Sequence, residues 1–381
     1  MSLKGHFNRF LQADPQRLHF AAHSHHPWPD VSFEAHQRAW LDAAELVDDK
    51  WDRILGETMP ALRGTIANLI GVEDGSSLVF APNTHEFLTR IFSCLEAPVR
   101  ILSSDSEFHS FTRQSRRWEE EGLAIVDRVP VEPFPTFGER FTREARAGVH
   151  DLIYFSQVFF NSGFVVEDLD RIVSSISEEK AYVVVDGYHA FMASPVNIGA
   201  IQDRVFYVAG GYKYAMAGEG VCFMHCPPGY GTRPTNTGWY AGFGQLESGV
   251  SKLVPYGEDG SRFSGATFDA SGIYRMKAVL DWLETEDVSP HDISEHVTRL
   301  QHQFLELDVS PGTLIPEEKQ PRGNFLTFED SRAPTIYQAL HGRKVITDYR
   351  GDRLRIGFGI YQDEADVSEL AVRLSAVLAD L

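Results

Sequence analysis

The stretch that decides the fold is AYVVVDGYHAFMASPVNIGAIQDRVFYVAGGYKYAMAGEG, residues 181–220. It opens with a short apolar run rich in valine, which predicts a strand buried on both faces and ending at Asp186. A second apolar run at 205–208 leads into the glycine-rich turn GGYKY, which presents Lys213. Ligands of open parallel sheets bind outside the carboxyl ends of the strands, so we expect Asp186 and Lys213 to face one crevice.

Each of these two residues alone has an ordinary structural explanation. A strand that ends in aspartate is common, and a single lysine is more often a solvated charge. The phosphate-loop pattern G-x-x-x-x-G-K-[ST] is absent because Tyr214 follows Lys213, and no strand opens into G-x-G-x-x-G. Together, however, Asp186 can pair with a pyridinium nitrogen, and a desolvated Lys213 can form an imine. This combination is the minimum that pyridoxal 5'-phosphate (PLP) requires.

The same stretch carries a family resemblance. Asp186-x-x-His189, then Tyr212 and Lys213, then AGEG at 217–220, resembles fold-type I PLP enzymes of the class V aminotransferase group, and kynureninase most of all. The resemblance extends over most of the chain. It implies that Lys213 binds the cofactor covalently and moves the Cα proton, while Asp186 keeps the ring nitrogen protonated. It also implies that His189 and Tyr212 support the phosphate side.

Alternating strand and helix patterns define the expected fold. Apolar runs near positions 79, 100, 125, 153, 183, 206 and 222 alternate with helical stretches, which predicts a mainly parallel seven-stranded sheet covered by helices. The resemblance implies the α/β architecture of PLP-dependent fold type I. We expect an N-terminal arm and helix at 1–50, a large PLP-binding domain at 51–285 and a small α/β C-terminal domain at 286–381.

Two helix starts should lie near the crevice. Asn83 and Thr84 follow a predicted strand and cap a helix through about residue 95, leaving backbone N–H groups that suit a phosphate. Capping alone also explains this pair, and the resemblance assigns both residues to the cofactor. Phe108 matches the aromatic residue that stacks on the cofactor ring, although a core phenylalanine is the alternative. Ser110 in the same turn is assigned to the cofactor as well.

Near the N-terminus, His23-Ser24-His25 stands where kynureninases carry Asn-Ser-Leu, so the resemblance places His23 and Ser24 at the substrate. No downstream spacing supports a metal site with these histidines, and none is predicted. Helical patterns follow over residues 31–70. We expect Asp30 to cap the first of these helices and Pro60 to open another.

A long loop at 227–266 is rich in glycine and proline, and the family places it at a dimer interface. The resemblance implies that Trp239 and Thr267 contact the cofactor, with parts of this segment reaching the phosphate of the neighbouring subunit. Gly265 is assigned to substrate binding, although kynureninases carry an asparagine near it. Phe159 likewise departs from a polar residue that often meets the cofactor's phenolic oxygen. A homodimer with active sites at its interface is therefore expected.

The C-terminal part begins after a helix near 273–283 and reads as helix, strand 324–328, helix, strands 344–347 and 354–358, and a last helix. Arg355 lies in an apolar strand and therefore requires an anionic partner. The resemblance assigns it to the substrate α-carboxylate, which a guanidinium binds bidentately. A structural ion pair with Asp348 or Asp352 is the alternative. The last helix should pack through one apolar face, formed by Val367, Leu370, Leu374, Val377 and Leu381.

Composition limits the partners. The 381 residues carry a formal charge of -19, which argues against nucleic acid and anionic membranes. Three cysteines form no disulfide framework, and no apolar run has membrane-spanning length, so a cytoplasmic location is expected.

The predicted partner is a small molecule, an α-amino acid, and the predicted reaction is kynureninase-like hydrolysis of a Cβ–Cγ bond. Transamination is the alternative. Cysteine desulfuration is disfavoured because residues 309–323 contain no cysteine. A PLP-fold protein that binds a ligand without turnover is a third reading.

Overall fold

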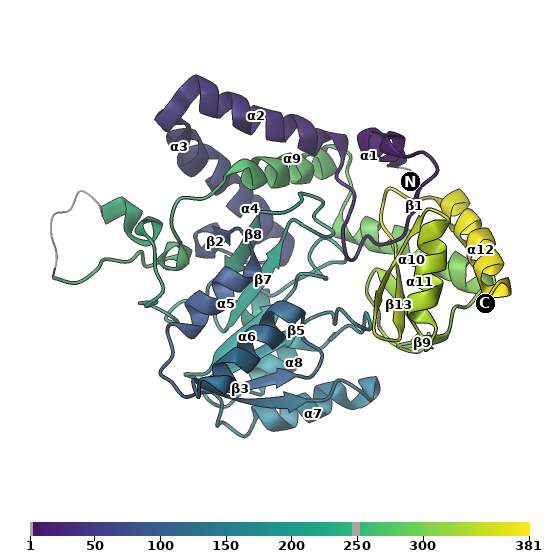
Figure 1. Cartoon of the computed structure of the whole chain (residues 1–381). Coiled ribbons are helices and arrows are strands. Elements are labelled where there is room, and N and C mark those ends of the chain that lie inside the picture. Colours follow the sequence, from purple (N-terminus) through teal and green to yellow (C-terminus); the bar gives the residue numbers. More distant parts are fainter. Residues whose placement is uncertain (1–2, 246–251) are drawn as a thin grey trace.

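A computed structural model of the chain describes residues 3–245 and 252–381 (Figure 1). Its centre is a seven-stranded sheet in the order β2-β8-β7-β6-β5-β3-β4. The strands of this sheet are β2 (Leu78–Ala81), β3 (Val99–Ser104), β4 (Ala124–Val129), β5 (Leu152–Ser156), β6 (Tyr182–Asp186), β7 (Val205–Gly210) and β8 (Cys222–His225). Strand β8 runs in the direction opposite to the other six strands of the sheet, so its pairings with β2 and β7 are antiparallel. The predicted seven strands and mainly parallel pairing are confirmed.

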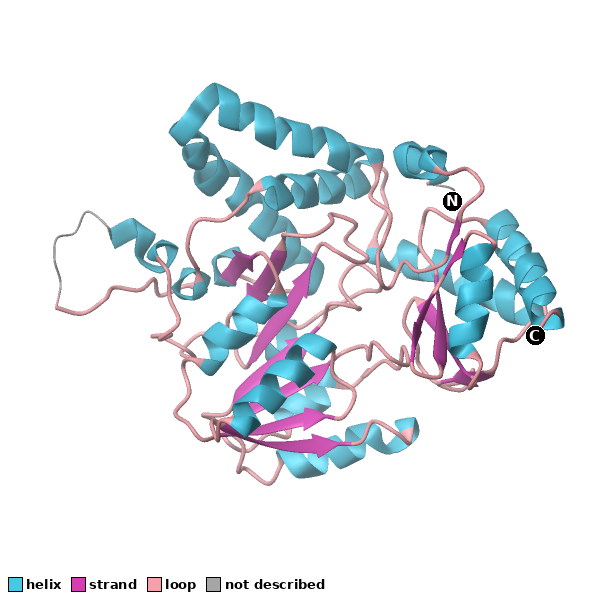
Figure 2. Cartoon of the chain, in the orientation of Figure 1, coloured by secondary structure: helices cyan, strands magenta, loops and turns pink. Residues whose placement is uncertain are grey.

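Helices cover both faces of this sheet, as Figure 2 shows. In β6, Val183 and Val185 join one apolar cluster and Val184 joins the other, so the strand is buried on both faces as predicted. One face is covered by α5 (Thr84–Phe92) and α6 (His109–Glu120). The other is covered by α4 (Met59–Ile70), α7 (Phe137–Ala145), α8 (Leu169–Ser174) and α9 (Ser271–Thr285).

A second, antiparallel sheet with the order β12-β13-β10-β9 forms a separate C-terminal core. Its elements are α10 (Pro290–Glu306), β9 (Thr313–Ile315), β10 (Phe325–Glu329), α11 (Ala333–Gly342), β12 (Asp348–Arg350), β13 (Arg353–Gly357) and α12 (Glu364–Ala379). The sequence pattern missed β9 and β12, which are three residues each. On the last helix the first four predicted apolar residues are buried, but Leu381 lies beyond the helix end and is exposed.

The N-terminal arm runs along this C-terminal core rather than standing free. After α1 (Asn8–Ala13), the short strand β1 (Leu18–His19) pairs in parallel with β11 (Val345–Ile346). Phe20 is buried in the C-terminal apolar cluster. The arm therefore leads residues 23–26 to the seam between the two sheets. The domain boundaries at residues 50 and 285 stay a prediction.

One capping prediction is wrong. Asp30 is the first residue of α2 (Asp30–Leu46), and Pro29 occupies the cap position. The Asp30 carboxylate instead accepts hydrogen bonds from the backbone N–H groups of Asn8 and Arg9, at 3.2 and 2.9 Å, so it caps α1. Helix α3 (Lys50–Arg53) and a π-helical turn then connect to α4, where Pro60 occupies the first turn as predicted.

Candidate active site

The carboxyl ends of β5, β6 and β7 open on a cavity of about 430 Å³ at the seam between the two sheets. Most of the residues that the sequence assigned to a site line this single cavity. They are His23, Ser24, Asn83, Thr84, Phe108, Ser110, Asp186, His189, Tyr212, Lys213 and Arg355. Parallel pairing of β5, β6 and β7 explains the convergence, because their carboxyl ends meet at the same edge.

Lys213 lies just after β7 and is almost fully buried. Its Nζ contacts Nε2 of His189 and lies 5.4 Å from the ring centroids of both Phe108 and Tyr188. Desolvation lowers the pKa of the Lys213 ammonium to about 7, against the opposing attraction of Asp186. A substantial fraction of the amine is therefore neutral near pH 7 and able to act as a nucleophile.

Asp186 is the last residue of β6, and both of its carboxylate oxygens accept hydrogen bonds from other residues. Oδ2 accepts a hydrogen bond from the Tyr154 hydroxyl at 2.8 Å, and Oδ1 accepts one from the backbone N–H of Tyr188 at 3.0 Å. Burial raises the pKa of this carboxyl, while the two hydrogen bonds and Lys213 oppose that rise. A buried acid in this position is suited to a cationic partner inside the cavity.

Two helix N-termini open on the same cavity. Asn83 caps α5, and its side chain accepts a hydrogen bond from the backbone N–H of Glu86 at 3.1 Å. Phe108 occupies the cap position of α6, and Ser110 lies in its first turn. Unpaired N–H groups and helix dipoles at these ends favour an anion such as phosphate.

Arg355 reaches the cavity from β13 in the C-terminal sheet. Its guanidinium donates to Asp348 Oδ2 and to the carbonyl oxygen of Phe160, and Arg350 contacts Asp348 Oδ1 at 2.5 Å. Desolvation lowers the pKa of Arg355 to about 10, which leaves it charged at neutral pH. The ion pair with Asp348, the alternative reading, is thus present, and Arg355 also lines the cavity.

The arm closes one side of the cavity. His23 is buried and stacks on Phe325, with the ring centroids 4.6 Å apart. Both of its ring nitrogens lack a hydrogen-bond partner, and burial lowers its pKa well below the usual value. His25 Nδ1 lies 3.2 Å from the Tyr212 hydroxyl. The neutral His23 imidazole can therefore accept a proton or donate the one that it carries.

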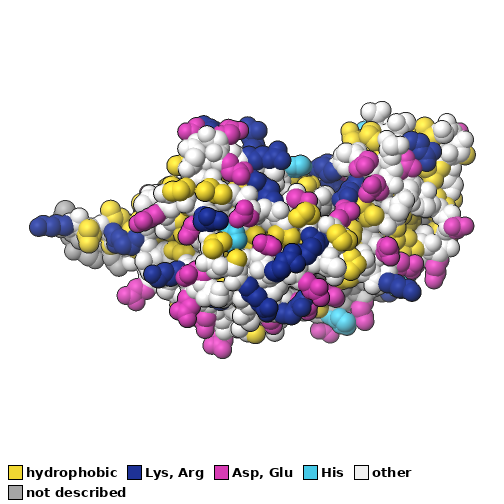
Figure 3. All heavy atoms as spheres, turned by 90° about the horizontal axis from the view of Figure 1, so that it is seen from below, with side chains coloured by type: hydrophobic (Ala, Val, Ile, Leu, Met, Phe, Trp, Pro, Cys, Tyr) yellow, Lys and Arg dark blue, Asp and Glu magenta, His cyan; other side chains and the backbone are white. Residues whose placement is uncertain are grey.

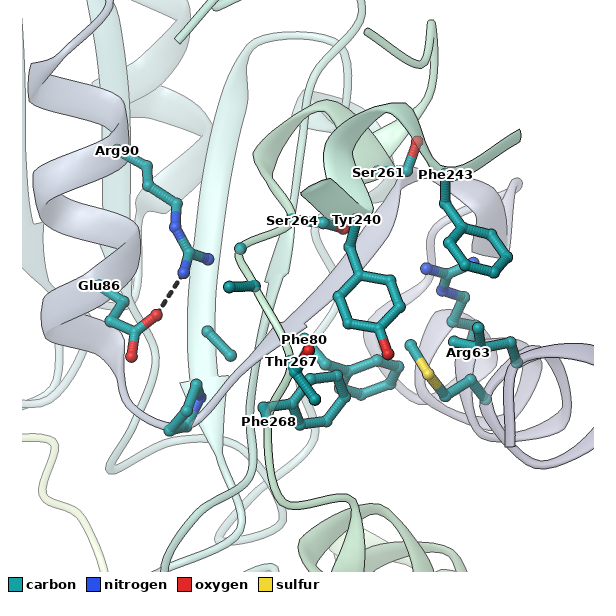
Figure 4. A pocket seen from close by; sticks show the side chains of 16 residues that line it. Arg63, Phe80, Glu86, Arg90, Tyr240, Phe243, Ser261, Ser264, Thr267 and Phe268 are labelled. Carbon is teal, nitrogen blue, oxygen red and sulfur yellow. Dashed lines mark hydrogen bonds and ion pairs between the residues drawn. The ribbon is translucent and has the colours of Figure 1, made fainter. Parts of the chain in front are cut away.

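Three predicted site residues do not reach this cavity within one chain. Gly265 and Thr267 line a second pocket of about 310 Å³ (Figure 4), and the Trp239 indole N–H donates to Thr267 Oγ1 at 3.1 Å. Because β8 is antiparallel, the chain leaves the sheet at the end opposite Lys213, and the loop returns beside the edge strand β2. Contact with a neighbouring subunit's cofactor stays a prediction. Residues 246–251 of the loop lie outside the described part.

Phe159, which stands where related enzymes often carry a polar residue for the cofactor, lies away from the cavity. Phe159 is fully buried against Phe137 and Phe164 and does not line the cavity, whereas Phe160 does. Position 159 therefore supplies no polar group to a cofactor. The sequence could not show this difference, because both residues follow the end of β5 at Ser156, where the strand alternation no longer applies.

Several cavity residues were missed by sequence reasoning. Next to the cavity, Glu107 is buried and accepts hydrogen bonds from Ser104 Oγ at 2.6 Å and from the cavity residue Ser156 through its Oγ at 2.5 Å. Burial raises the pKa of Glu107 to about 8. The missed residues that line the cavity itself are His85, Ser156, Phe160, Tyr188, Cys222 and Arg350. Two of them had a signal in the sequence: Tyr188 lies between Asp186 and His189, and Arg350 belongs to the stretch Asp348-Tyr349-Arg350, which resembles a C-terminal motif of the family.

The residues present fit PLP. The cavity combines a desolvated amine, a buried acid and two helix N-termini, and Nδ1 of His189 and Nε of Arg355 are buried without partners. Such orphaned groups suit a polar ligand that completes their hydrogen bonds. Within residues 3–245 and 252–381, no group of three or more metal-ligating side chains is assembled.

Comparison with known proteins agrees with this class of site. Residues 53–370 match the family "Aminotransferase class-V", so the chain belongs to that family. It is therefore a PLP-dependent enzyme of the class V group. An isopenicillin N epimerase from Streptomyces clavuligerus is 29% identical over 412 residues, covering 96% of each protein.

Solved structures match the whole fold. A cysteine desulfurase from Thermococcus onnurineus NA1 has a TM-score of 0.80 at 16% identity, covering 100% of this chain and 99% of that one. A C-DES variant with glycine covalently linked to its PLP cofactor has a TM-score of 0.81 at 16% identity, with 98% and 99% covered. Across the described residues, no helix is long and apolar enough to cross a membrane.

Proposed function

We propose that this enzyme removes the α-proton of an amino-acid substrate, kynurenine or a related compound, and then hydrolyses its Cβ–Cγ bond. The observation that carries the proposal is the shared cavity of Lys213, Asp186 and Arg355. PLP, when bound, supplies a ring that withdraws electron density from the α-carbon. The residues of the chain bind, orient and move protons around that centre.

Each residue has a proposed role. Lys213 binds the cofactor aldehyde and then carries the Cα proton, which its pKa of about 7 supports. Asp186 would pair with the pyridine nitrogen of the cofactor, and Phe108 would pack against its ring. Arg355, held at a fixed angle by Asp348, binds the substrate α-carboxylate bidentately.

Further side chains bind the cofactor phosphate and the substrate. Asn83, Thr84 and Ser110 are proposed to hold the phosphate at the two helix ends, with His189 and Tyr212 beside Lys213. His23 and Ser24 face the substrate side chain. Gly265 lies in the second pocket and is proposed to act at the neighbouring subunit's site.

Hydrolysis requires a proton donor for Cβ once the bond breaks. Water adds to the γ-carbonyl carbon, the Cβ–Cγ electron pair stays on Cβ, and Cβ takes a proton, giving alanine and a carboxylic acid. Tyr212 is suited to donate that proton, because burial raises its pKa and keeps its phenol protonated near neutral pH. Its hydrogen bond with His25 offers a route for replacing the proton.

A second candidate is inversion at Cα, favoured by the 29% identity to an isopenicillin N epimerase. It would use Lys213 as one acid-base group and the Tyr212–His25 pair as the other. Transamination by the same residues is the third outcome. Desulfuration through a protein thiol is disfavoured, because burial raises the pKa of Cys222, the cysteine at the cavity, to about 12.

One experiment separates these reactions. The holoenzyme is incubated in D₂O with kynurenine and a panel of L-amino acids, and the products are identified by mass and chiral chromatography. Alanine and an aryl carboxylic acid would support the proposal. Uncleaved substrate that contains both Cα configurations and deuterium at Cα would show epimerisation instead of hydrolysis. An α-keto acid product would show transamination instead.

The matched controls for that experiment are two lysine variants. Lys213→Ala should abolish every product. Lys277→Ala should behave like the unmodified enzyme, since Lys277 pairs with Asp281 on the surface of α9, away from the cavity.

We also propose a cytoplasmic homodimer in which Trp239 and Thr267 contact the partner's cofactor phosphate. Their exposure outside the Lys213 cavity supports this arrangement, and the three free cysteines fit a reducing compartment. Mixing Lys213→Ala and Thr267→Val chains should rebuild one complete site in each mixed dimer, restoring about a quarter of the covalently bound PLP. If subunits exchange between the dimers but the mixture recovers no covalently bound PLP, a site shared between subunits is contradicted.

A further inference from the structure

Tyr154 is a buried phenol that the proposed chemistry leaves unused. It lies on β5, where its sequence neighbours are apolar, and its hydroxyl donates to Asp186 Oδ2 at 2.8 Å. Its ring is clamped by Phe111 of α6, with the two centroids 3.9 Å apart and the planes 10° from parallel. The phenol therefore has one fixed direction, toward the carboxylate.

The surroundings of Asp186 make this hydrogen bond consequential. The titratable groups that interact with the carboxyl come from five strands of the sheet and the turns that follow them: Tyr154, Glu107, Tyr188, Tyr207, Lys213 and Cys222. Of these, Tyr154 is the one that donates a side-chain hydrogen bond to the carboxylate within the described residues. Burial disfavours the ionised carboxylate, so a donor is required to stabilise it.

We propose that Tyr154 is a positioning residue that keeps Asp186 ionised and aimed at the cofactor ring, so that the proton of the Asp186–pyridine pair stays on the ring nitrogen. The inference rests on the proposed role of Asp186 as partner of that nitrogen. A donor on the carboxylate favours the ion pair over the neutral pair, in which the proton has moved to Asp186. Without the phenol, the population of the neutral pair would increase, and the ring would withdraw electrons less strongly.

The chain offers a matched control. Tyr207 is also fully buried, on the neighbouring strand β7, but its hydroxyl donates to Gln157 Oε1 at 2.9 Å instead of to Asp186. Tyr154→Phe and Tyr207→Phe each remove one buried hydroxyl and leave the ring in place. General destabilisation should therefore be similar in both variants, and only the first should alter the cofactor.

The test is spectroscopic and requires no substrate. Holoenzyme variants are titrated with pH while the absorption of the bound cofactor is followed, and PLP release is measured by dialysis. In Tyr154→Phe, the pH midpoint of the change in cofactor absorption should move upward by about one unit, and the protein should retain PLP about tenfold less tightly. Both effects have the size expected for the loss of one hydrogen bond to a charged group. Tyr207→Phe should change neither.

An unchanged midpoint and unchanged retention in Tyr154→Phe would overturn the inference. If that variant does not fold, Phe111→Leu loosens the same clamp and should produce a smaller upward shift, with no shift again counting against the inference. A wild-type protein without any Lys213-dependent cofactor band would instead refute the proposed function. The two failures are thus distinguishable.

Discussion

The ion pair behind the substrate arginine gives a prediction that depends only on the chain. Arg355 is 2% exposed, and Asp348 is the carboxylate it contacts. Asp348 also pairs with Arg350 at 2.5 Å. Asp348→Asn keeps the size of the side chain and removes the charge, leaving the Arg355 guanidinium buried beside the carbonyl of Phe160 and without an anion.

The structure sets the size of the effect. Removing one partner of a buried ion pair costs about 3–5 kcal/mol, because the remaining charge stays desolvated. Asparagine can still accept one hydrogen bond from Arg355, so we expect about 3 kcal/mol in the free energy of unfolding. With Asp348 in place the pKa of Arg355 is about 10, and loss of Asp348 lowers this pKa further because Asp348 opposes the effect of burial.

Urea denaturation of the cofactor-free chain at pH 7 measures this difference. The control is Glu132→Gln. Glu132 is half-exposed and pairs at 2.6 Å with Arg353, which lies on the same strand as Arg355, so this variant also removes one carboxylate charge from an arginine. Exposed pairs contribute at most about 1 kcal/mol. If Asp348→Asn destabilises the chain no more than Glu132→Gln does, the reasoning about this buried pair is refuted.

Three further predictions concern the cavity wall. The rate at which the cofactor-free chain captures PLP should rise with pH around a midpoint near 7, because Lys213 reacts as the neutral amine and its pKa is about 7; a midpoint near 10 in stopped-flow absorption would contradict this. The lowered pKa also means that the unfolded chain binds more protons above pH 7, so this group contributes stability that increases with pH there. Asn83→Asp should keep the α5 cap and the unfolding free energy yet weaken PLP binding about tenfold or more, since it places a negative charge at the phosphate; equal PLP affinity by titration would argue against that helix end. Gly187→Ala should lower the unfolding free energy by about 2 kcal/mol or more, because its Cβ would lie 1.9 Å from the hydroxyl oxygen of buried Tyr207; a thermal midpoint equal to wild type would show that the strand end can shift.

Strand ends carried most of what the sequence could predict about this site. Apolar runs gave the seven strands, and the rule for parallel sheets brought Asp186 and Lys213 together. The same residues allowed the class V family to be recognised. These features depend on local patterns and on one topological rule, so they can be derived without three-dimensional coordinates.

Features that depend on packing could not be derived. Tyr154 sits within an apolar strand, and nothing in the sequence shows that its hydroxyl meets Asp186. Asp30 stands where a cap is expected, but the fold turns its carboxylate toward α1. Glu107 resembles an ordinary turn residue until Ser104 and Ser156 enclose it.

The two aromatic residues at 159 and 160 illustrate the same limit. A one-residue difference decides which of them faces the cavity, and strand periodicity is lost where β5 ends at Ser156. The net charge of -19 likewise does not predict where individual charges lie. On the face shown in Figure 3, basic and acidic side chains are interspersed, and two arginines line the cavity.

Chemical capture of the cofactor tests the central claim most directly. Holoenzyme is reduced with borohydride, digested, and mapped by mass spectrometry, with Lys213→Ala treated in parallel. We predict a single phosphopyridoxyl adduct on the peptide containing Lys213 and no adduct in the variant. An adduct on a different lysine, or none in a protein that carries PLP, would contradict the account.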